Sequence, residues 1–261
     1  MTLFRTALVA TCLTVATLAA HADLLDDITK AKKIRISTDM AIPPAGMMDS
    51  NMQPTGSDVE TAKLLAKDWG LEIEWVPTTG ATRIPNVNTG KADIIISTLS
   101  VTPERAKVID FSKPYAVLQS VVGAPKSAAI KDWGDLKGKN ITVTRGTTQD
   151  TELSGMANEK GFKVVRYDDD ATMVTAGATG QAEAVATSVA LVNAISAKNP
   201  AKPWEPKFVI RNFDLAIGMK QGEPRLKAKV DEWVAANLKN GKLSDIYKKY
   251  YGVALPASMT N

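Results

Sequence analysis

An arginine at the start of a short predicted helix is the first candidate for binding chemistry in this sequence. Residues 98–105 read TLSVTPER, so hydroxyl groups alternate with apolar residues just before the helix begins. Thr102 is suited to cap that helix, and Pro103 fits its first turn. Arg105 then stands beside backbone N–H groups that have no partner within the helix. This combination favours binding of a carboxylate, unless Arg105 pairs with a nearby acid such as Asp110.

A second stretch of the chain combines the same kinds of groups. Residues 140–145 alternate in polarity and predict a strand, and Gly146 follows it directly. Thr147 and Thr148 then open a predicted helix with two hydroxyl groups. By itself this turn is typical of a capped helix that binds nothing. Two such helix starts, in separate parts of the chain, together favour one shared site for an anion.

Strands and helices alternate along the chain, which predicts the α/β fold class. Residues 57–69 place apolar side chains at helical spacing, and Gly70 is a typical helix stop. The order strand, helix, strand, helix, strand favours a parallel sheet. The predicted strands of this first part are residues 34–39, 71–76 and 92–97.

Two apolar extended segments divide the chain into lobes. Residues 116–124 are interpreted as a crossing into a second lobe and residues 208–219 as the return, with a loop at 198–207 before it. The expected organisation is a signal peptide at 1–22, a first lobe at 23–118, a second lobe at 119–212, and a return to the first lobe at 213–261.

The first 22 residues have the pattern of a cleavable secretory signal. Arg5 precedes an apolar run that is too short to span a bilayer, and small residues stand before the expected cleavage after Ala22. The single cysteine, Cys12, and the single histidine, His21, would leave with this segment. We therefore expect no cofactor, no metal site and no cysteine–histidine or serine–histidine catalysis. The net charge of +4 is small, and nucleic acid is not an expected partner.

The longest motif resembles the signature of the family 3 extracytoplasmic solute-binding proteins, which are the polar amino-acid receptors of ABC importers. The similarity runs through residues 92–115 and continues with a DLKGK turn at 135–139 and a terminal helix at 241–252. The resemblance implies the two-lobed, type II periplasmic-binding-protein fold. In that fold two crossing strands form the hinge, and the ligand cleft lies between the lobes.

The resemblance also implies roles for individual residues. Arg105 would hold the ligand's α-carboxylate, and the second lobe would close on it through its threonines. Arg83 would point into the cleft, where two guanidinium groups would favour a ligand with two acidic groups. The other interpretation of Arg83 is an exposed arginine on a helix edge. The expected ligand-binding residues are Asp39, Ile42, Arg83, Thr98, Ser100, Arg105, Thr147, Thr148 and Ser188.

Two of these positions have a particular meaning. Asp39 would touch the distal group of the ligand, or would simply cap its own loop, and Ile42 stands where the family often has an aromatic residue. Ser188 occupies the place of an aspartate that usually neutralises the ligand's ammonium group. A buried ammonium group needs a counter-charge. Three explanations stay open: another acid (Asp39, Asp214 or Glu183) serves instead, the ligand lacks an ammonium group, or the function has changed.

The expected function is therefore that of a monomeric periplasmic binding protein. It would bind an amino acid or a related small carboxylate and deliver it to an ABC permease in the inner membrane. We expect no enzymatic activity. One alternative is a dehydratase of the cyclohexadienyl type, which needs a buried acid with a raised pKa, and the sequence identifies none. Another is a ligand sensor that acts on a membrane receptor through the same cleft.

Overall fold

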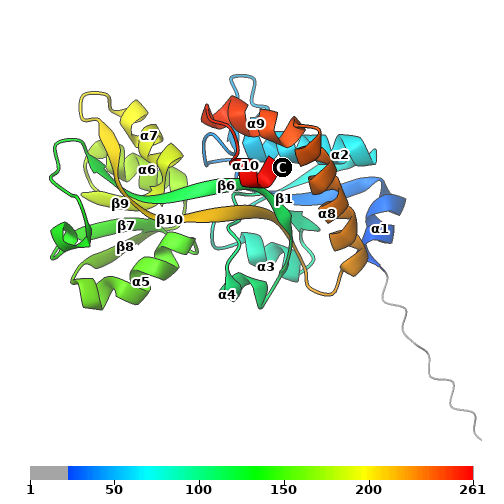
Figure 1. Cartoon of the computed structure of the whole chain (residues 1–261), viewed down its shortest axis with the longest axis horizontal. Coiled ribbons are helices and arrows are strands. Elements are labelled where there is room, and N and C mark those ends of the chain that lie inside the picture. The colour runs from blue at the N-terminus through cyan, green and yellow to red at the C-terminus, as the bar shows by residue number, and fades with distance from the viewer. Residues whose placement is uncertain (1–22, 261) are drawn as a thin grey trace, which may run out of the picture.

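Two long antiparallel strands, β6 (Asp110–Pro125) and β10 (Trp204–Met219), run through both halves of the molecule (Figure 1). In this computed structural model, which describes residues 23–260, they pair along almost their whole length. They occupy the middle of one eight-stranded sheet, in the order β4-β1-β5-β10-β6-β9-β7-β8. The two-lobed α/β fold predicted from the sequence is thus confirmed, with β6 and β10 as the connection between the lobes.

Both crossing strands are longer than predicted. The predicted loop at 198–207 is wrong in its last part, because β10 already begins at Trp204, where it pairs with Pro125. β6 begins at Asp110 although Pro114 lies within it. Pro114 is tolerated because the register with β10 shifts there, and proline is compatible with a strand at such an irregularity.

The first lobe has a parallel sheet, as its strand–helix alternation predicted. β1 (Lys33–Thr38) pairs in parallel with β4 (Glu72–Pro77) and with β5 (Ile94–Ile95), which is shorter than the predicted strand. The core is formed by fully buried side chains from these strands and from helix α2, among them Ile36, Leu65 and Ile94. The remaining elements are α1 (Leu24–Ala31), β2 (Met47–Met48), β3 (Pro54–Thr55), α2 (Ser57–Trp69), α3 (Arg83–Asn88), α4 (Pro103–Ala106), α8 (Pro224–Lys239), α9 (Lys242–Tyr251) and α10 (Ala257–Thr260).

The second lobe repeats this arrangement at the other end of the long strands. β7 (Asn140–Thr144) pairs in parallel with β8 (Lys163–Tyr167) and β9 (Ala184–Ser188). Its helices are α5 (Thr148–Lys160), α6 (Asp170–Thr179), α7 (Val189–Lys198) and the short 3-10 helix η1 (Trp133–Leu136). In both lobes the residues that follow the carboxyl ends of the parallel strands face the other lobe. That edge is where open α/β sheets bind ligands.

The predicted lobe boundaries fall at one level of the connecting strands, because Leu118 pairs with Phe213 and Gln119 with Asn212. These boundaries stay predictions. The predicted signal peptide at 1–22 lies outside the described residues. Among the helices of residues 23–260, none has the length and apolar character needed to cross a membrane.

Candidate functional site

A cavity lies between the two lobes and gathers most of the predicted site residues. It takes residues from both lobes in equal number and one from β6. Its lining consists of Asp39, Ile42, Gly80, Arg83, Ser97, Thr98, Ser100, Leu118, Thr147, Thr148, Gln149, Asp170, Thr187, Ser188 and Leu191. Of the nine predicted residues, only Arg105 is absent from this lining. It lines an adjoining hollow together with Thr148, which belongs to both.

Arg83 is a buried cation on the wall of the cavity. It is only 6% exposed, so the interpretation as an arginine on an exposed helix edge is wrong. Its Nη1 donates to the carbonyl oxygens of Ser97 (2.6 Å) and Thr98 (3.4 Å), whereas its buried Nε has no hydrogen-bond partner among residues 23–260. Burial lowers the pKa of Arg83, although nearby acids oppose this shift. The guanidinium therefore has donor capacity that the described protein groups do not use.

Arg105 connects the lobes from the first turn of α4. The side chain of Thr102 caps this helix by accepting from Arg105 N (3.2 Å), as the sequence predicted. The guanidinium donates from Nη1 to the Ser100 carbonyl oxygen (2.9 Å) and from Nη2 to that of Gly146 in the second lobe (3.2 Å). The alternative pairing with Asp110 does not occur, since that carboxylate accepts from Gly222 N. Burial, and then the charge of Arg83, lowers the pKa of Arg105 to about 9.

Two carboxylates line the cavity near Arg83. Asp39 is 6% exposed and accepts from Ala41 N (2.9 Å), so it caps its loop and also lines the cavity. Asp170 is 5% exposed and accepts from the Thr144 hydroxyl (2.5 Å). Burial raises the pKa of both, that of Asp170 to about 6. Within residues 23–260, no lysine or arginine nitrogen lies within 4.0 Å of either carboxylate.

Asp170 was not among the predicted site residues. The acids that were considered as replacements for the missing aspartate lie at different places in the structure. Ser188 lines the cavity, but its hydroxyl also accepts from Leu191 N (3.3 Å) and caps α7. Glu183 is exposed and accepts from Asn140 N, and Asp214 lines the adjoining hollow. Of the three acids considered from the sequence, only Asp39 lines the cavity itself.

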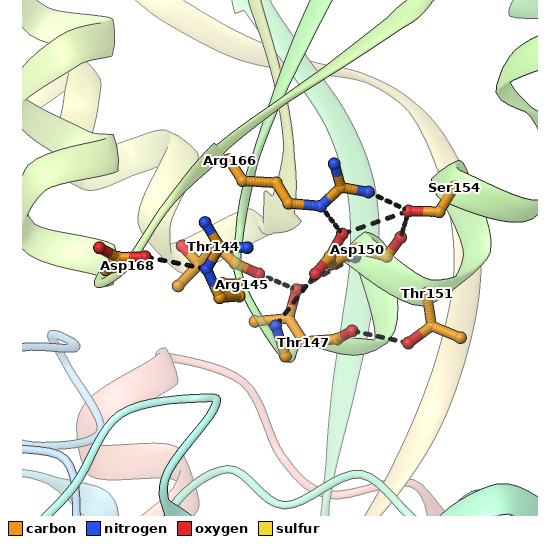
Figure 2. A network of polar contacts seen from close by, with 9 residues as sticks. Thr144, Arg145, Thr147, Asp150, Thr151, Ser154, Arg166 and Asp168 are labelled. Carbon is orange, nitrogen blue, oxygen red and sulfur yellow. Dashed lines mark hydrogen bonds and ion pairs between the residues drawn. The ribbon is translucent and has the colours of Figure 1, made fainter.

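The second-lobe turn at Gly146–Thr148 is held by a polar network (Figure 2). The Thr147 hydroxyl donates to the Thr144 carbonyl oxygen (2.7 Å) and caps α5 by accepting from Asp150 N (3.2 Å). The Asp150 carboxylate accepts from Gly146 N (3.1 Å) and pairs with Arg166. The Thr147 hydroxyl is therefore already used by the fold. What this turn offers a ligand is a fixed backbone and the side chain of Thr148, whose hydroxyl donates to Gln149 Oε1 (3.2 Å) on the same helix.

Thr98 has an unusual backbone conformation that a buried acid supports. Its φ is +41°, which is strained for a β-branched residue. Its N–H donates to Asp58 Oδ2 (2.7 Å), and Asp58 Oδ1 accepts from the Tyr115 hydroxyl (2.8 Å). Asp58 is 2% exposed, and burial raises its pKa to about 6. Asp58 therefore positions Thr98, a role that its place in a predicted helix did not reveal.

The lobes approach so closely at Gly80 that a side chain would collide. A Cβ at Gly80 would lie 2.8 Å from the Arg145 carbonyl oxygen of the other lobe. We expect Gly80→Ala to weaken ligand binding about 10-fold, because the clash arises only when the lobes meet. Calorimetric titration measures this loss, and thermal unfolding without ligand should be little changed.

Gly155→Ala is the matched control for this substitution. A Cβ at Gly155 in α5 would have nothing within 4 Å, so affinity should stay at the wild-type value. Equal affinities of the two variants would show that Gly80 and Arg145 do not meet in the ligand-bound protein.

The comparisons with known proteins agree on one family. The sequence model of the bacterial extracellular solute-binding proteins, family 3, matches residues 34–253. The L-cystine-binding protein TcyJ of Escherichia coli (strain K12) is 27% identical over 240 residues, covering 89% of this chain and 88% of that protein. The L-arginine-binding protein of Pseudomonas aeruginosa is 28% identical over 228 residues, covering 84% and 88%.

Solved structures similar to this chain are also amino-acid-binding proteins. A solute receptor for L-cysteine from Neisseria gonorrhoeae superposes with a TM-score of 0.80 at 32% identity, covering 87% of this chain and 92% of the receptor. The ancestral amino acid-binding protein AncCDT-1, described as a precursor of cyclohexadienyl dehydratase, gives 0.77 at 33% identity, covering 87% and 99%.

Proposed function

This chain belongs to the bacterial extracellular solute-binding proteins of family 3, and we propose that it binds a zwitterionic amino acid between its lobes. One observation carries the proposal. Two guanidinium groups and two carboxylates surround the cleft, and among residues 23–260 none of them forms an ion pair. Charges out of water are stable only when they are paired. A ligand that carries one carboxylate and one ammonium group supplies both missing partners.

The carboxylate of the ligand binds near Arg105 and Thr148. Arg105 donates to backbone carbonyl oxygens of both lobes, and a carboxylate accepts from a guanidinium more strongly than a carbonyl does. The hydroxyls of Thr98 and Ser100 also line the cavity and have no hydrogen-bond partner within residues 23–260. Because the ligand contacts both lobes, it favours the closed arrangement about the hinge of β6 and β10.

The charge balance of the cleft argues against the expected preference for a ligand with two acidic groups. Arg83 and Arg105 are opposed by Asp39 and Asp170, with Asp58 behind the wall as a further acid near Arg83. A second ligand carboxylate would therefore meet these acids rather than a surplus of positive charge. We expect amino acids with neutral or basic side chains to bind more tightly than aspartate or glutamate.

We also propose that the protein acts in the periplasm after cleavage of residues 1–22, as a monomer that delivers its ligand to an ABC permease. The support is the family itself and the similarity to proteins named for the binding of cystine and arginine. A sensor would use the same cleft but a different membrane partner. Co-purification with an ABC permease from the membrane fraction distinguishes transport from sensing.

A thermal-shift screen of residues 23–261 tests the binding proposal. The protein is unfolded and refolded to remove carried-over ligand, then heated with each standard amino acid, dicarboxylates and deaminated analogues. A compound at one hundred times its Kd should raise the unfolding free energy by about 2.7 kcal/mol. Failure of every amino acid to raise the Tm would contradict the proposal.

Asp170 gives a specific reason to keep the dehydratase as a second candidate. A carboxyl group with a pKa of about 6 in the cavity can hold a proton near neutral pH and act as a general acid on a departing hydroxyl group. The sequence alone identified no such acid. Prephenate and arogenate turnover by wild type and Asp170→Asn tests it: product from the wild type alone supports the enzyme, and no product from either supports the binding protein.

A further inference from the structure

We infer that Asp170 binds the ammonium group of the ligand, in place of the acid that is absent at Ser188. The inference rests on the proposed function, since it concerns the same cleft and takes the ligand to be an amino acid. The position of Asp170, its lack of a cationic partner and the different roles of the acids around it support the assignment.

The fold places Asp170 close to Ser188 on one lobe. Ser188 ends β9, and β7, which ends at Thr144, is the neighbouring strand. The Thr144 hydroxyl donates to Asp170 Oδ1 (2.5 Å), which fixes this carboxylate over the end of β7. Neighbouring strands lie about 4.8 Å apart. An ammonium group beside Ser188 is therefore about one strand away from the Asp170 carboxylate.

The Asp170 carboxylate is buried and only partly satisfied. Its exposed fraction is 5%, and it lines the cavity. Within residues 23–260, the Thr144 hydroxyl is its one hydrogen-bond donor, and no cation lies within 4.0 Å. A buried carboxylate binds a cation strongly because water does not compete for it. An ammonium group, with three N–H donors, can bond to Oδ2 of Asp170 and to other oxygens of the cavity wall.

Three consecutive aspartates precede or begin α6, and only the last faces the cavity. The exposed Asp168 pairs with Arg145 (2.9 Å), as Figure 2 shows. Asp169 caps the helix by accepting from Thr172 N (2.7 Å). Asp170 neither forms an ion pair nor caps the helix in the described structure; its carboxylate accepts from the Thr144 hydroxyl, and the residue lines the cavity.

Asp39, the other acid of the cavity, is less suited to this role. It follows β1 on the first lobe, whereas Ser188 belongs to the second lobe. One of its carboxylate oxygens caps the loop at Ala41. Asp39 therefore reaches the cavity from the opposite lobe, although it is near enough for its charge to help raise the pKa of Asp170. It provides a control that removes a cavity charge outside the second lobe.

The experiment uses matched pairs of probes that differ only in the ammonium group. They are L-cysteine and 3-mercaptopropionate, L-arginine and 5-guanidinopentanoate, and L-glutamine and 4-carbamoylbutanoate. Calorimetric titration at pH 7.5 gives Kd for the wild type, Asp170→Asn and Asp39→Asn. We expect Asp170→Asn to weaken the amino acid about 30-fold or more and its deaminated partner less than about threefold. Asp39→Asn should change the Kd of the amino acid and that of its deaminated partner by similar factors.

Relocating the charge gives a second, independent test. In the double variant Asp170→Asn/Ser188→Asp the acid returns to position 188, and amino-acid binding should recover at least in part. If Asp170→Asn bound the amino acid with the same Kd as the wild type, the inference would be overturned and the proposed function would stay intact. A wild type that binds only the deaminated probes would also overturn it. A wild type that binds no probe, and no amino acid of the thermal screen, removes the proposed function itself.

Discussion

Replacing Arg105 by alanine is expected to weaken amino-acid binding by about 100- to 1,000-fold, the largest effect of any single substitution in the cleft. Truncating one partner of a buried charge pair costs about 2–5 kcal/mol, and each 1.4 kcal/mol is a factor of ten in Kd. Arg105 also donates to carbonyl oxygens of both lobes, so the variant loses part of the contact that holds them together. Calorimetric titration of wild type and variant measures the loss.

Stability should respond much less than affinity to this substitution. Arg105 is only partly buried, and in residues 23–260 its guanidinium bonds to two carbonyl oxygens and to no acid. Net contributions of such bonds are about 1 kcal/mol each. The unfolding free energy without ligand should therefore fall by no more than about 2 kcal/mol, which separates a binding role from a structural one.

Two control variants test whether the loss of affinity is specific to the guanidinium group of Arg105. Arg145→Ala removes an exposed guanidinium that pairs with Asp168 close to the cleft, and it should leave Kd nearly unchanged. Arg105→Lys keeps the charge but loses planar two-point donation, so it should bind with intermediate affinity. If Arg105→Ala bound amino acids as tightly as the wild type, the carboxylate would have to be held by Arg83 instead.

The parts of the site that could be predicted from sequence are those set by local geometry. Thr102 caps α4 and Thr147 caps α5, because a hydroxyl at a helix start needs only residues two or three positions away. The parallel strands followed from alternation along the chain. Arg83 and Ser188 were expected at a common cavity from the family resemblance, and they line one.

The parts that could not be predicted depend on contacts between distant segments. Asp168, Asp169 and Asp170 are three consecutive residues of the same type, so the sequence does not distinguish them. Tertiary packing pairs the first with Arg145, makes the second a helix cap and places the third at the cavity. The start of β10 at Trp204 was missed for a similar reason. Its neighbours include Lys and Pro, which are typical of loops, and it becomes a strand because β6 lies beside it.

The second large effect concerns Asp58, for which no role in the site was expected from sequence. Asp58→Ala leaves the Thr98 N–H and the Tyr115 hydroxyl without their acceptor in a dry environment. Each buried donor without a partner costs about 1–3 kcal/mol, so the unfolding free energy should fall by about 2–6 kcal/mol. Chemical denaturation at pH 7 measures this change. Affinity should fall as well, because Asp58 holds Thr98 in its strained conformation at the cavity wall.

Asp58→Asn separates the hydrogen bonds of this residue from its charge. Burial raises the pKa of Asp58 from 3.8 to about 6, so the folded protein binds this proton more tightly than the unfolded chain does. The contribution of this group to the unfolding free energy then decreases by about 3 kcal/mol as the pH rises from about 4 to about 6. Asparagine cannot ionise, yet its amide can accept from Thr98 N and donate to the Tyr115 oxygen.

The variant should therefore lose that part of the pH dependence while it stays folded at pH 7. Asp170, whose pKa burial also raises to about 6, retains its own contribution to the slope, so the unfolding free energies of wild type and Asp58→Asn should differ in their pH dependence by the contribution of Asp58 alone. Adding Asp170→Asn should remove a second contribution of similar size. A decrease in Asp58→Asn as steep as in the wild type would mean that Asp58 titrates near its ordinary pKa. Its carboxylate would then be mostly ionised above about pH 5, and the fold would be holding Thr98 with a buried charge.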